Sequence, residues 1–277
     1  IGLVALALVT VILVVWSLPQ TRNPQIPATP APVPVPTVTE SVTAEASSPS
    51  TPEPSSTPKP SSTPSAAPTG LAGFATLLKR HDPVSVLVMG DGSGNETDEW
   101  VYLWAHDHLA ADREVKYHAW NADSSRWGKA VTTGKGAATT VWNASKKSPD
   151  LAKEAKRLSA VWHPADVVIL SYGHRGDPKT IASQLDDMRK AVKAKNPQAI
   201  VLVMIQNPDP VATQYNQADT TKAVKAWAKK RDLDTVNIYD AFVNDPAPRY
   251  SLVEFDGSPT PLGSALWART FAEAIAH

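Results

Sequence analysis

The chain has 277 residues, enough for one ordinary domain with accessory segments, and its 27 basic and 27 acidic residues cancel to a formal charge of zero. Nucleic-acid-binding proteins need a concentrated basic face, so we expect no nucleic-acid partner. The sequence contains no cysteine, which excludes disulfides, thiolate metal sites and cysteine nucleophiles.

The chain starts with an apolar stretch, residues 1–18, in which only Thr10 and Ser17 are polar. A helix of this length nearly spans the hydrocarbon core of a bilayer, and no A-x-A-like cleavage site closes the stretch. Only Arg22 is basic before Lys59, which favours export of the C-terminal side. We therefore expect a transmembrane signal anchor that contacts the membrane and an extracytoplasmic C-terminal part. Secretion after signal cleavage is the alternative.

Residues 19–70 are rich in proline, serine and threonine, and they hold more than half of the 25 prolines. Proline fixes φ and lacks an amide donor, so such a segment cannot build a packed core. The composition predicts a disordered stalk that leads into a folded domain at residues 71–277.

In that domain, strand-length apolar runs alternate with helical patterns. The expected strands are Val84–Met89, Val115–Trp120, Thr139–Asn143, Asp166–Ser171, Ala199–Ile205 and Thr235–Tyr239. The expected helices are Glu99–Ala111, Asp150–Ala160, Lys179–Lys195, Asp219–Arg231 and Leu262–Ala276. Several strands are continuous Val, Ile and Leu runs, which are typical of parallel strands buried on both faces. The pattern predicts an α/β fold, a three-layer α/β/α sandwich around a central parallel sheet of the flavodoxin-like type, with its site at the carboxyl ends of the strands.

Polar sequences stand where such a site is expected. In chain order they are "GDGSGN", "NASKKSPD", "SYGHRGDP" and, before the last helix, "FDGSPTPLG". Their order and content resemble the SGNH (GDSL) hydrolase family of esterases and lipases over about residues 83–277. The resemblance implies an α/β/α domain descended from ester hydrolases that act on acylated glycans or lipids, without a cofactor. No metal site is expected either, because His106 and His108 lie two apart on a predicted helix and point to different faces.

The family takes its name from four residues, one in each sequence block: a serine nucleophile after Gly-Asp, a glycine and an asparagine that bind the oxyanion, and a histidine base. Here the matching positions hold Gly92, Ser148, Arg175 and, if the last block has lost one residue, Ser258. Loss of the nucleophile or the base of such a site costs about 10⁶ in turnover. The resemblance therefore implies a catalytically degenerate copy, retained as a binder of a cell-envelope glycan or acyl ester.

An active esterase is the alternative, with Ser93 as a shifted nucleophile, His174 as its base and Asp256 as the orienting carboxylate. A purely structural domain on a stalk has no positive signal in the sequence. The candidate binding residues are Asp91, Gly92, Asn143, Ser148, Arg175, Ser258 and Trp127. Trp127 is included because it lies in a polar loop, where an indole ring could stack on a sugar.

Overall fold

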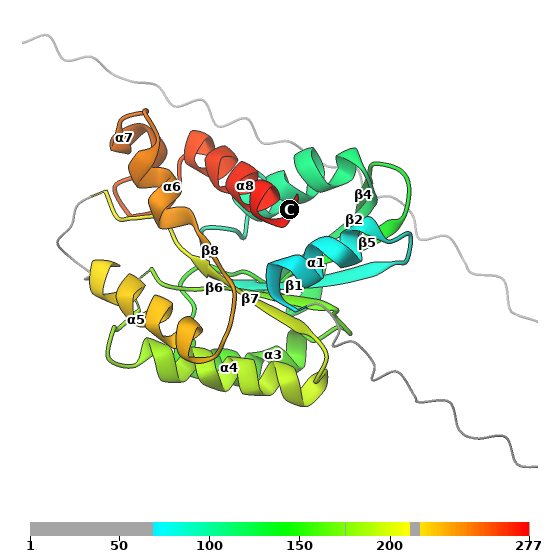
Figure 1. The fold of residues 1–277 in the computed structure, drawn as a ribbon, viewed down its shortest axis with the longest axis horizontal. Coiled ribbons are helices and arrows are strands. Elements are labelled where there is room, and N and C mark those ends of the chain that lie inside the picture. The colour runs from blue at the N-terminus through cyan, green and yellow to red at the C-terminus, as the bar shows by residue number, and fades with distance from the viewer. Residues whose placement is uncertain (1–68, 175, 211–216, 277) are drawn as a thin grey trace, which may run out of the picture. The chain divides into compact units, whose positions relative to one another are not determined.

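The computed structural model describes residues 69–174, 176–210 and 217–276, which form an α/β/α sandwich (Figure 1). The predicted fold class is confirmed. The predicted anchor at residues 1–18 and nearly all of the predicted stalk lie outside the described residues. Among the helices that are described, none combines the length and the apolar character needed to cross a membrane.

An eight-stranded sheet lies at the centre of the described residues, in the order β3-β2-β5-β1-β6-β7-β8, with β4 also paired to β2. The strands are β1 Val84–Gly90, β2 Glu114–Asn121, β3 Arg126–Trp127, β4 Val131–Thr133, β5 Ala138–Asn143, β6 Val167–Ser171, β7 Ile200–Ile205 and β8 Thr235–Asn237. All neighbours pair in parallel except β3 and β4, which run antiparallel to β2. The carboxyl ends of the parallel strands therefore meet at one edge of the sheet.

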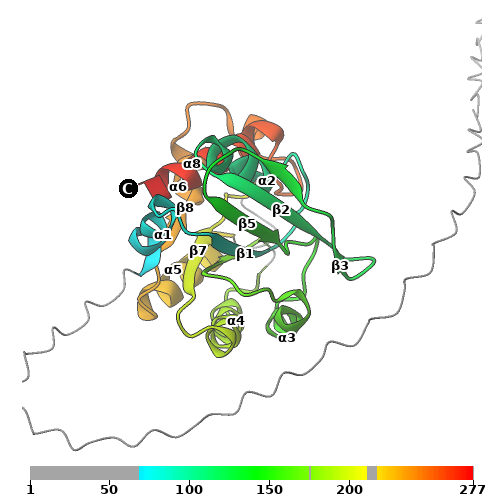
Figure 2. The ribbon, with the colours of Figure 1, turned by 90° about the vertical axis from the view of Figure 1, so that its right-hand side faces the viewer.

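Helices cover both faces of the sheet (Figure 2). On one face lie α1 Gly70–Lys79, α2 Trp100–Leu103, α6 Ile238–Asn244, α7 Arg249–Leu252 and α8 Pro261–Ala276. On the other lie α3 Leu151–Val161, α4 Ile181–Lys195 and α5 Gln217–Lys230. The helix predicted at Glu99–Ala111 is composite: after α2 the chain forms a π-helical turn, Trp104–His108, and a 3₁₀ turn, Leu109–Ala111.

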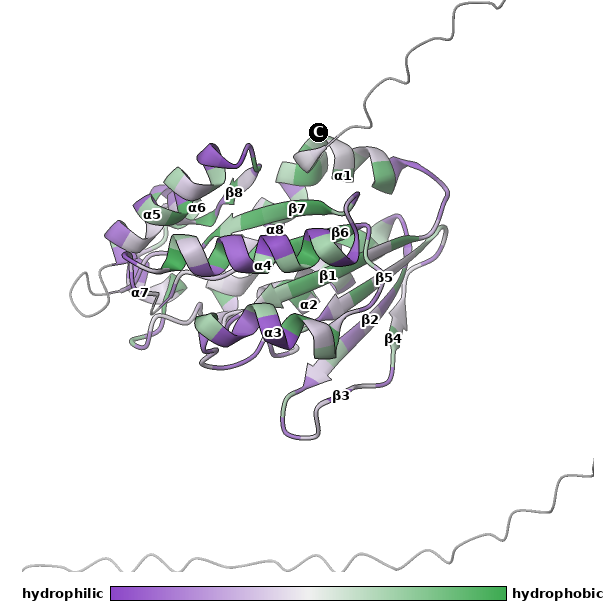
Figure 3. Cartoon of the chain, turned by 90° about the horizontal axis from the view of Figure 1, so that it is seen from below, coloured by the Kyte–Doolittle hydropathy of each residue, from purple (hydrophilic) through white to green (hydrophobic). Residues whose placement is uncertain are grey.

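Strand β1 lies in the middle of the sheet, between β5 and β6. Its carboxyl end leads directly into the pocket. Val86 and Val88 face the core under α2 and α8, whereas Leu87 and Met89 face the core under α3 and α4. In Figure 3 the central strands are correspondingly hydrophobic, whereas hydrophobic and hydrophilic residues alternate along α3 and α4. A strand buried on both faces is held rigidly, so the loop after Gly90 starts from a fixed point.

The short elements β3, β4, α6 and α7 were not predicted. Two further differences can be traced to particular side chains. The strand expected at Thr235–Tyr239 ends at Asn237, because the Asn237 side chain accepts a hydrogen bond from the Asp240 amide and caps α6. Helix α1 was not predicted; its first turn is held by the Leu71 amide, which donates to Asp234 Oδ2 at 2.7 Å. Both differences depend on side-chain contacts that periodicity does not reveal.

Candidate functional site

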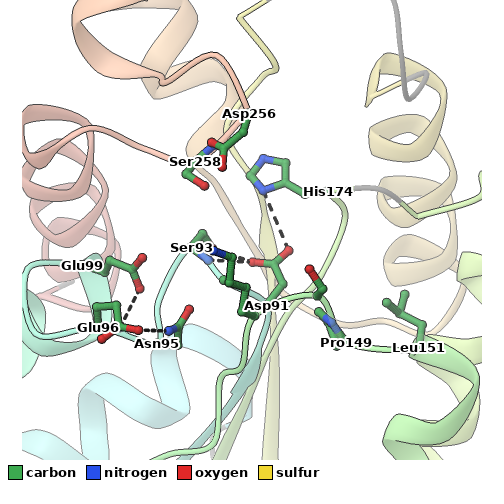
Figure 4. Close-up of a pocket in the computed structure, with 14 residues that line it drawn as sticks. Asp91, Ser93, Asn95, Glu96, Glu99, Pro149, Leu151, His174, Asp256 and Ser258 are labelled. Carbon is green, nitrogen blue, oxygen red and sulfur yellow. Dashed lines mark hydrogen bonds and ion pairs between the residues drawn. The ribbon is translucent and has the colours of Figure 1, made fainter.

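A pocket of about 270 Å³ opens at the carboxyl edge of the sheet (Figure 4). Loops after β1, β5 and β6 line it, together with the turn before α8. The sequence-predicted residues that line it are Asp91, Gly92, Ser93, Ser148, His174, Asp256 and Ser258. Segments that are far apart in the sequence thus meet in one cavity. Arg175 lies outside the described residues.

Asp91 is the hydrogen-bonding centre of the pocket floor and is only 6% exposed. Its Oδ1 accepts from the Ser93 amide at 3.1 Å and from Ser93 Oγ at 2.8 Å. Its Oδ2 accepts from Gln206 Nε2 at 2.8 Å and lies 3.8 Å from His174 Nδ1. The Ser93 hydroxyl is therefore held by a carboxylate.

His174 is oriented by the loop after β7. Its Nε2 lies 3.0 Å from the Asn207 carbonyl oxygen, which can only accept, so Nε2 carries a proton. Its backbone amide donates to Gln206 Oε1 at 2.6 Å. In residues 69–174, 176–210 and 217–276 no imidazole makes a hydrogen bond to Ser93 Oγ. The Ser93–His174 pair that an esterase would need is not formed in this arrangement.

At two positions, Gly92 and Ser148, the backbone can be compared with the residues that the resemblance implies there. A Cβ added to Gly92 would lie 3.4 Å from both Asn95 Oδ1 and Lys147 Cα, an ordinary contact distance, so a side chain fits there. Ser148 has φ +50°, in the left-handed region that favours glycine. This is the position where the resemblance places the family's oxyanion glycine. At both positions the backbone would accommodate the residue type that the resemblance implies.

Comparison with known proteins addresses the fold. No family model matches the chain, and no curated protein matches it in sequence. Solved structures do match. A two-domain esterase active on acetylated mannans is 14% identical with a TM-score of 0.55, and the match covers 75% of this chain and 53% of that one.

Two smaller hydrolases match over nearly their whole length. A lipase/acylhydrolase from Enterococcus faecalis is 13% identical, with a TM-score of 0.51, covering 70% of this chain and 95% of that one. A protein described as a GDSL-like lipase from Parabacteroides merdae is 14% identical, with a TM-score of 0.50, covering 70% and 96%. The domain has the SGNH-hydrolase fold. At these identities the likeness concerns the fold alone.

Within the SGNH-hydrolase fold, Glu99 is a pocket residue that the sequence reasoning missed. It immediately precedes α2, lines the cavity and accepts a hydrogen bond from the Glu96 amide at 2.7 Å. Burial raises the pKa of Glu99 from 4.5 to about 7. The "TDEW" sequence contained the residue, but nothing in that pattern signals a carboxyl group that is half-protonated near neutral pH.

We expect the stability of the domain to depend on the Glu99 proton. Because the pKa is raised in the folded state, the stabilisation is fully present below pH 4.5 and is lost as the pH rises through about 7. The full shift would correspond to about 3 kcal/mol, which partial exposure to water reduces to about 1–2 kcal/mol. Urea unfolding of the wild type and Glu99→Gln at about pH 5 and about pH 8 measures this. Between the lower and the higher pH, the free energy of unfolding of the wild type should fall by about 1–2 kcal/mol more than that of the variant. Equal changes in both proteins would contradict the raised pKa of Glu99.

Asn143, a predicted binding residue, does not line the pocket. It is 1% exposed, and its amide donates to the Tyr117 hydroxyl at 2.8 Å and to the Gly94 carbonyl. Its Oδ1 accepts from the Ser145 amide at 3.0 Å. The Gly94 contact ties the loop after β1 to the end of β5, the Tyr117 contact joins β5 to β2, and the Ser145 contact holds the start of the loop after β5. Asn143 is therefore a residue that positions the site rather than one that binds a ligand.

Trp127 does not line the pocket either. Trp142 is sandwiched between His118 and His163, with ring centroids 4.1 Å and 3.6 Å away, and Trp127 packs at a steep angle against Trp142 and Trp120. Burial, with the neighbouring His118, lowers the pKa of His163. The three tryptophans are partly buried and pack against the core cluster on the α3 side of the sheet. Trp127 therefore packs against other aromatic rings, outside this pocket.

No group of three or more His, Asp or Glu side chains in the described part of the chain could hold a metal ion. The polar groups that line the pocket are carboxylates, an amide, hydroxyls, a lysine and a histidine.

Proposed function

We propose that this domain is a non-hydrolytic binding module whose pocket takes a cell-envelope carbohydrate. One observation carries the proposal: the cavity persists while Gly92 and Ser258 line it at the positions that the resemblance gives to the nucleophile and the base. Ser93, the nearest substitute for the nucleophile, donates its hydroxyl hydrogen bond to Asp91.

The polar groups that line the cavity suit a ligand rich in hydroxyl groups. The carboxylates of Asp91 and Glu96 accept hydrogen bonds, the Asn95 amide donates and accepts them, and the hydroxyls of Ser148 and Ser258 do both. Sugar hydroxyls are donors and acceptors at once and can pair with such a mixed set. A few convergent polar groups in a concave site are the usual basis of small-ligand recognition.

An active esterase would need His174 and Ser93 to form different hydrogen bonds from those in the structure. Its ring would have to leave the Asn207 carbonyl and turn toward Ser93, and Ser93 would have to leave Asp91. Each change breaks a hydrogen bond in or beside the pocket. We favour the binding module for this reason.

Short acyl esters test the proposal. We expect no hydrolysis above background by the wild type, and none by Gly92→Ser, since the restored hydroxyl would fit but would have no base. Turnover is measured with p-nitrophenyl acetate, and circular dichroism checks that the variant is folded. Hydrolysis by the wild type that disappears in Ser93→Ala would establish the esterase instead.

We also propose that residues 1–18 anchor the chain in a membrane and that residues 19–70 hold the domain away from it on the extracytoplasmic side. The apolar stretch and the proline-rich composition support this. Membrane fractionation compares the full chain with a chain that lacks residues 1–18. The shortened chain should appear in the soluble fraction, whereas its retention with the membrane would contradict the anchor.

A further inference from the structure

An aromatic ring stands in solvent beside the pocket. Phe255 is 90% exposed, and the next three residues of the chain, Asp256 to Ser258, all line the cavity. Exposed turns usually carry small or polar residues, because a ring gains nothing from water. A phenylalanine at the tip of a turn that borders a binding pocket is therefore a candidate contact residue.

The turn that carries Phe255 is held in place. The Gly257 amide donates to the Glu254 carbonyl at 3.0 Å, and the Glu254 amide donates to the Ser258 carbonyl at 2.8 Å. From the loop after β7, Asn207 Nδ2 donates to the Gly257 carbonyl at 3.1 Å. Gly257 has φ +90°, a conformation that other residues rarely adopt. The ring is thus presented from a fixed backbone at the rim of the pocket.

Resting on the proposed function, we propose that Phe255 stacks against one sugar ring of an oligosaccharide while the neighbouring ring occupies the pocket. A pyranose has an apolar C–H face and a rim of hydroxyls. The exposed phenyl ring offers a flat apolar surface for the first, and the polar lining of the pocket offers partners for the second. Tyr250 and Leu262, which are 81% and 54% exposed, come from α7 and α8, the helices that precede and follow this turn in the chain.

The lining favours a sugar over an acyl chain. Among the described residues that line the cavity, Pro149 and Leu151 are the large apolar ones, and the others are mostly carboxylates, hydroxyls, an amide, a lysine and a histidine. An acyl chain would shield these polar groups from water without offering them hydrogen bonds, which is costly. The hydroxyls of a sugar can offer hydrogen bonds in place of that water.

Titration calorimetry on the full chain tests the proposal, with chitotetraose, mannotetraose and cellotetraose and their monosaccharides as probes. We expect one tetrasaccharide to bind, and Phe255→Ala to weaken that binding about tenfold. The same variant should leave binding of the monosaccharide unchanged, because a single ring occupies only the pocket. Phe255→Trp should retain tetrasaccharide binding. Val131→Ala is the matched control, since Val131 is an exposed apolar residue of β4 that does not line the pocket, and it should bind as the wild type does.

Three other outcomes would contradict the stacking role of Phe255, the carbohydrate pocket, or both. If Phe255→Ala binds the tetrasaccharide as tightly as the wild type, the stacking role is wrong and the carbohydrate pocket stands. If the wild type binds none of the sugars, both proposals are wrong. If octyl glucoside binds through Phe255 while every tetrasaccharide fails, the ring contacts an alkyl chain and the sugar assignment is wrong.

Discussion

Replacing Asp91 by alanine is expected to lower the free energy of unfolding by about 3 kcal/mol, because hydrogen-bond donors in the pocket floor lose their acceptor. The Ser93 amide, the Ser93 hydroxyl and Gln206 Nε2 all donate to this carboxylate. Gln206 in turn holds the backbone of His174, so the loop after β6 should loosen as well. Urea unfolding measures the loss, and calorimetry with the sugar probes should show that binding has disappeared.

Asp91→Asn serves as the matched control. Its side-chain oxygen can still accept from Ser93, but its NH₂ group faces the Gln206 amide, so we expect a smaller loss of about 1–2 kcal/mol. If Asp91→Ala unfolds within about 0.5 kcal/mol of the wild type, the side chain is not the centre of the pocket floor.

Glu154→Ala should have the largest effect on stability, a loss of about 3–5 kcal/mol. Glu154 is 1% exposed, accepts from Arg157 Nη2 at 2.6 Å and from the Tyr172 hydroxyl at 2.5 Å. The alanine variant leaves the Arg157 charge unpaired under the sheet. Arg157 also donates to the Ala144 carbonyl, so the loop that leads from β5 to the pocket should lose a contact.

A surface ion pair on the same helix provides the control. Lys153 Nζ lies 2.8 Å from Asp150 Oδ2, and both side chains are exposed, so Lys153→Ala should change the free energy of unfolding by less than about 0.5 kcal/mol. Thermal or urea unfolding compares the two variants. Equal losses in both would show that burial does not decide the strength of the Glu154 pair.

The parallel α/β/α architecture and the position of the pocket could be predicted because they depend on patterns of several residues. The apolar run before Gly90 predicts a buried central strand, and parallel strands end at one edge of the sheet. That rule predicts that Ser93 and His174 lie close together, and the family resemblance adds Asp256 from the turn before the last helix. The structure places all three around one cavity.

Hydrogen-bond partners could not be predicted in the same way. The sequence did not show that the Ser93 hydroxyl would point to Asp91, or that His174 would bind the Asn207 carbonyl. The second contact is made by the loop after β7, which no motif marked. The exposure of individual side chains could not be predicted either. Trp127 lies in a polar sequence but packs against other rings, whereas Phe255 is exposed to solvent.

Intact-mass analysis after treatment with a serine-directed fluorophosphonate tests the central claim most directly. Covalent labelling needs a serine hydroxyl activated by a base, and here the Ser93 hydroxyl is bound to Asp91 with no imidazole partner in the described residues. We predict that the unmodified full chain keeps its mass while an active serine esterase treated in parallel is labelled completely. Stoichiometric labelling of the unmodified chain that is lost in Ser93→Ala would contradict the account and establish a serine esterase.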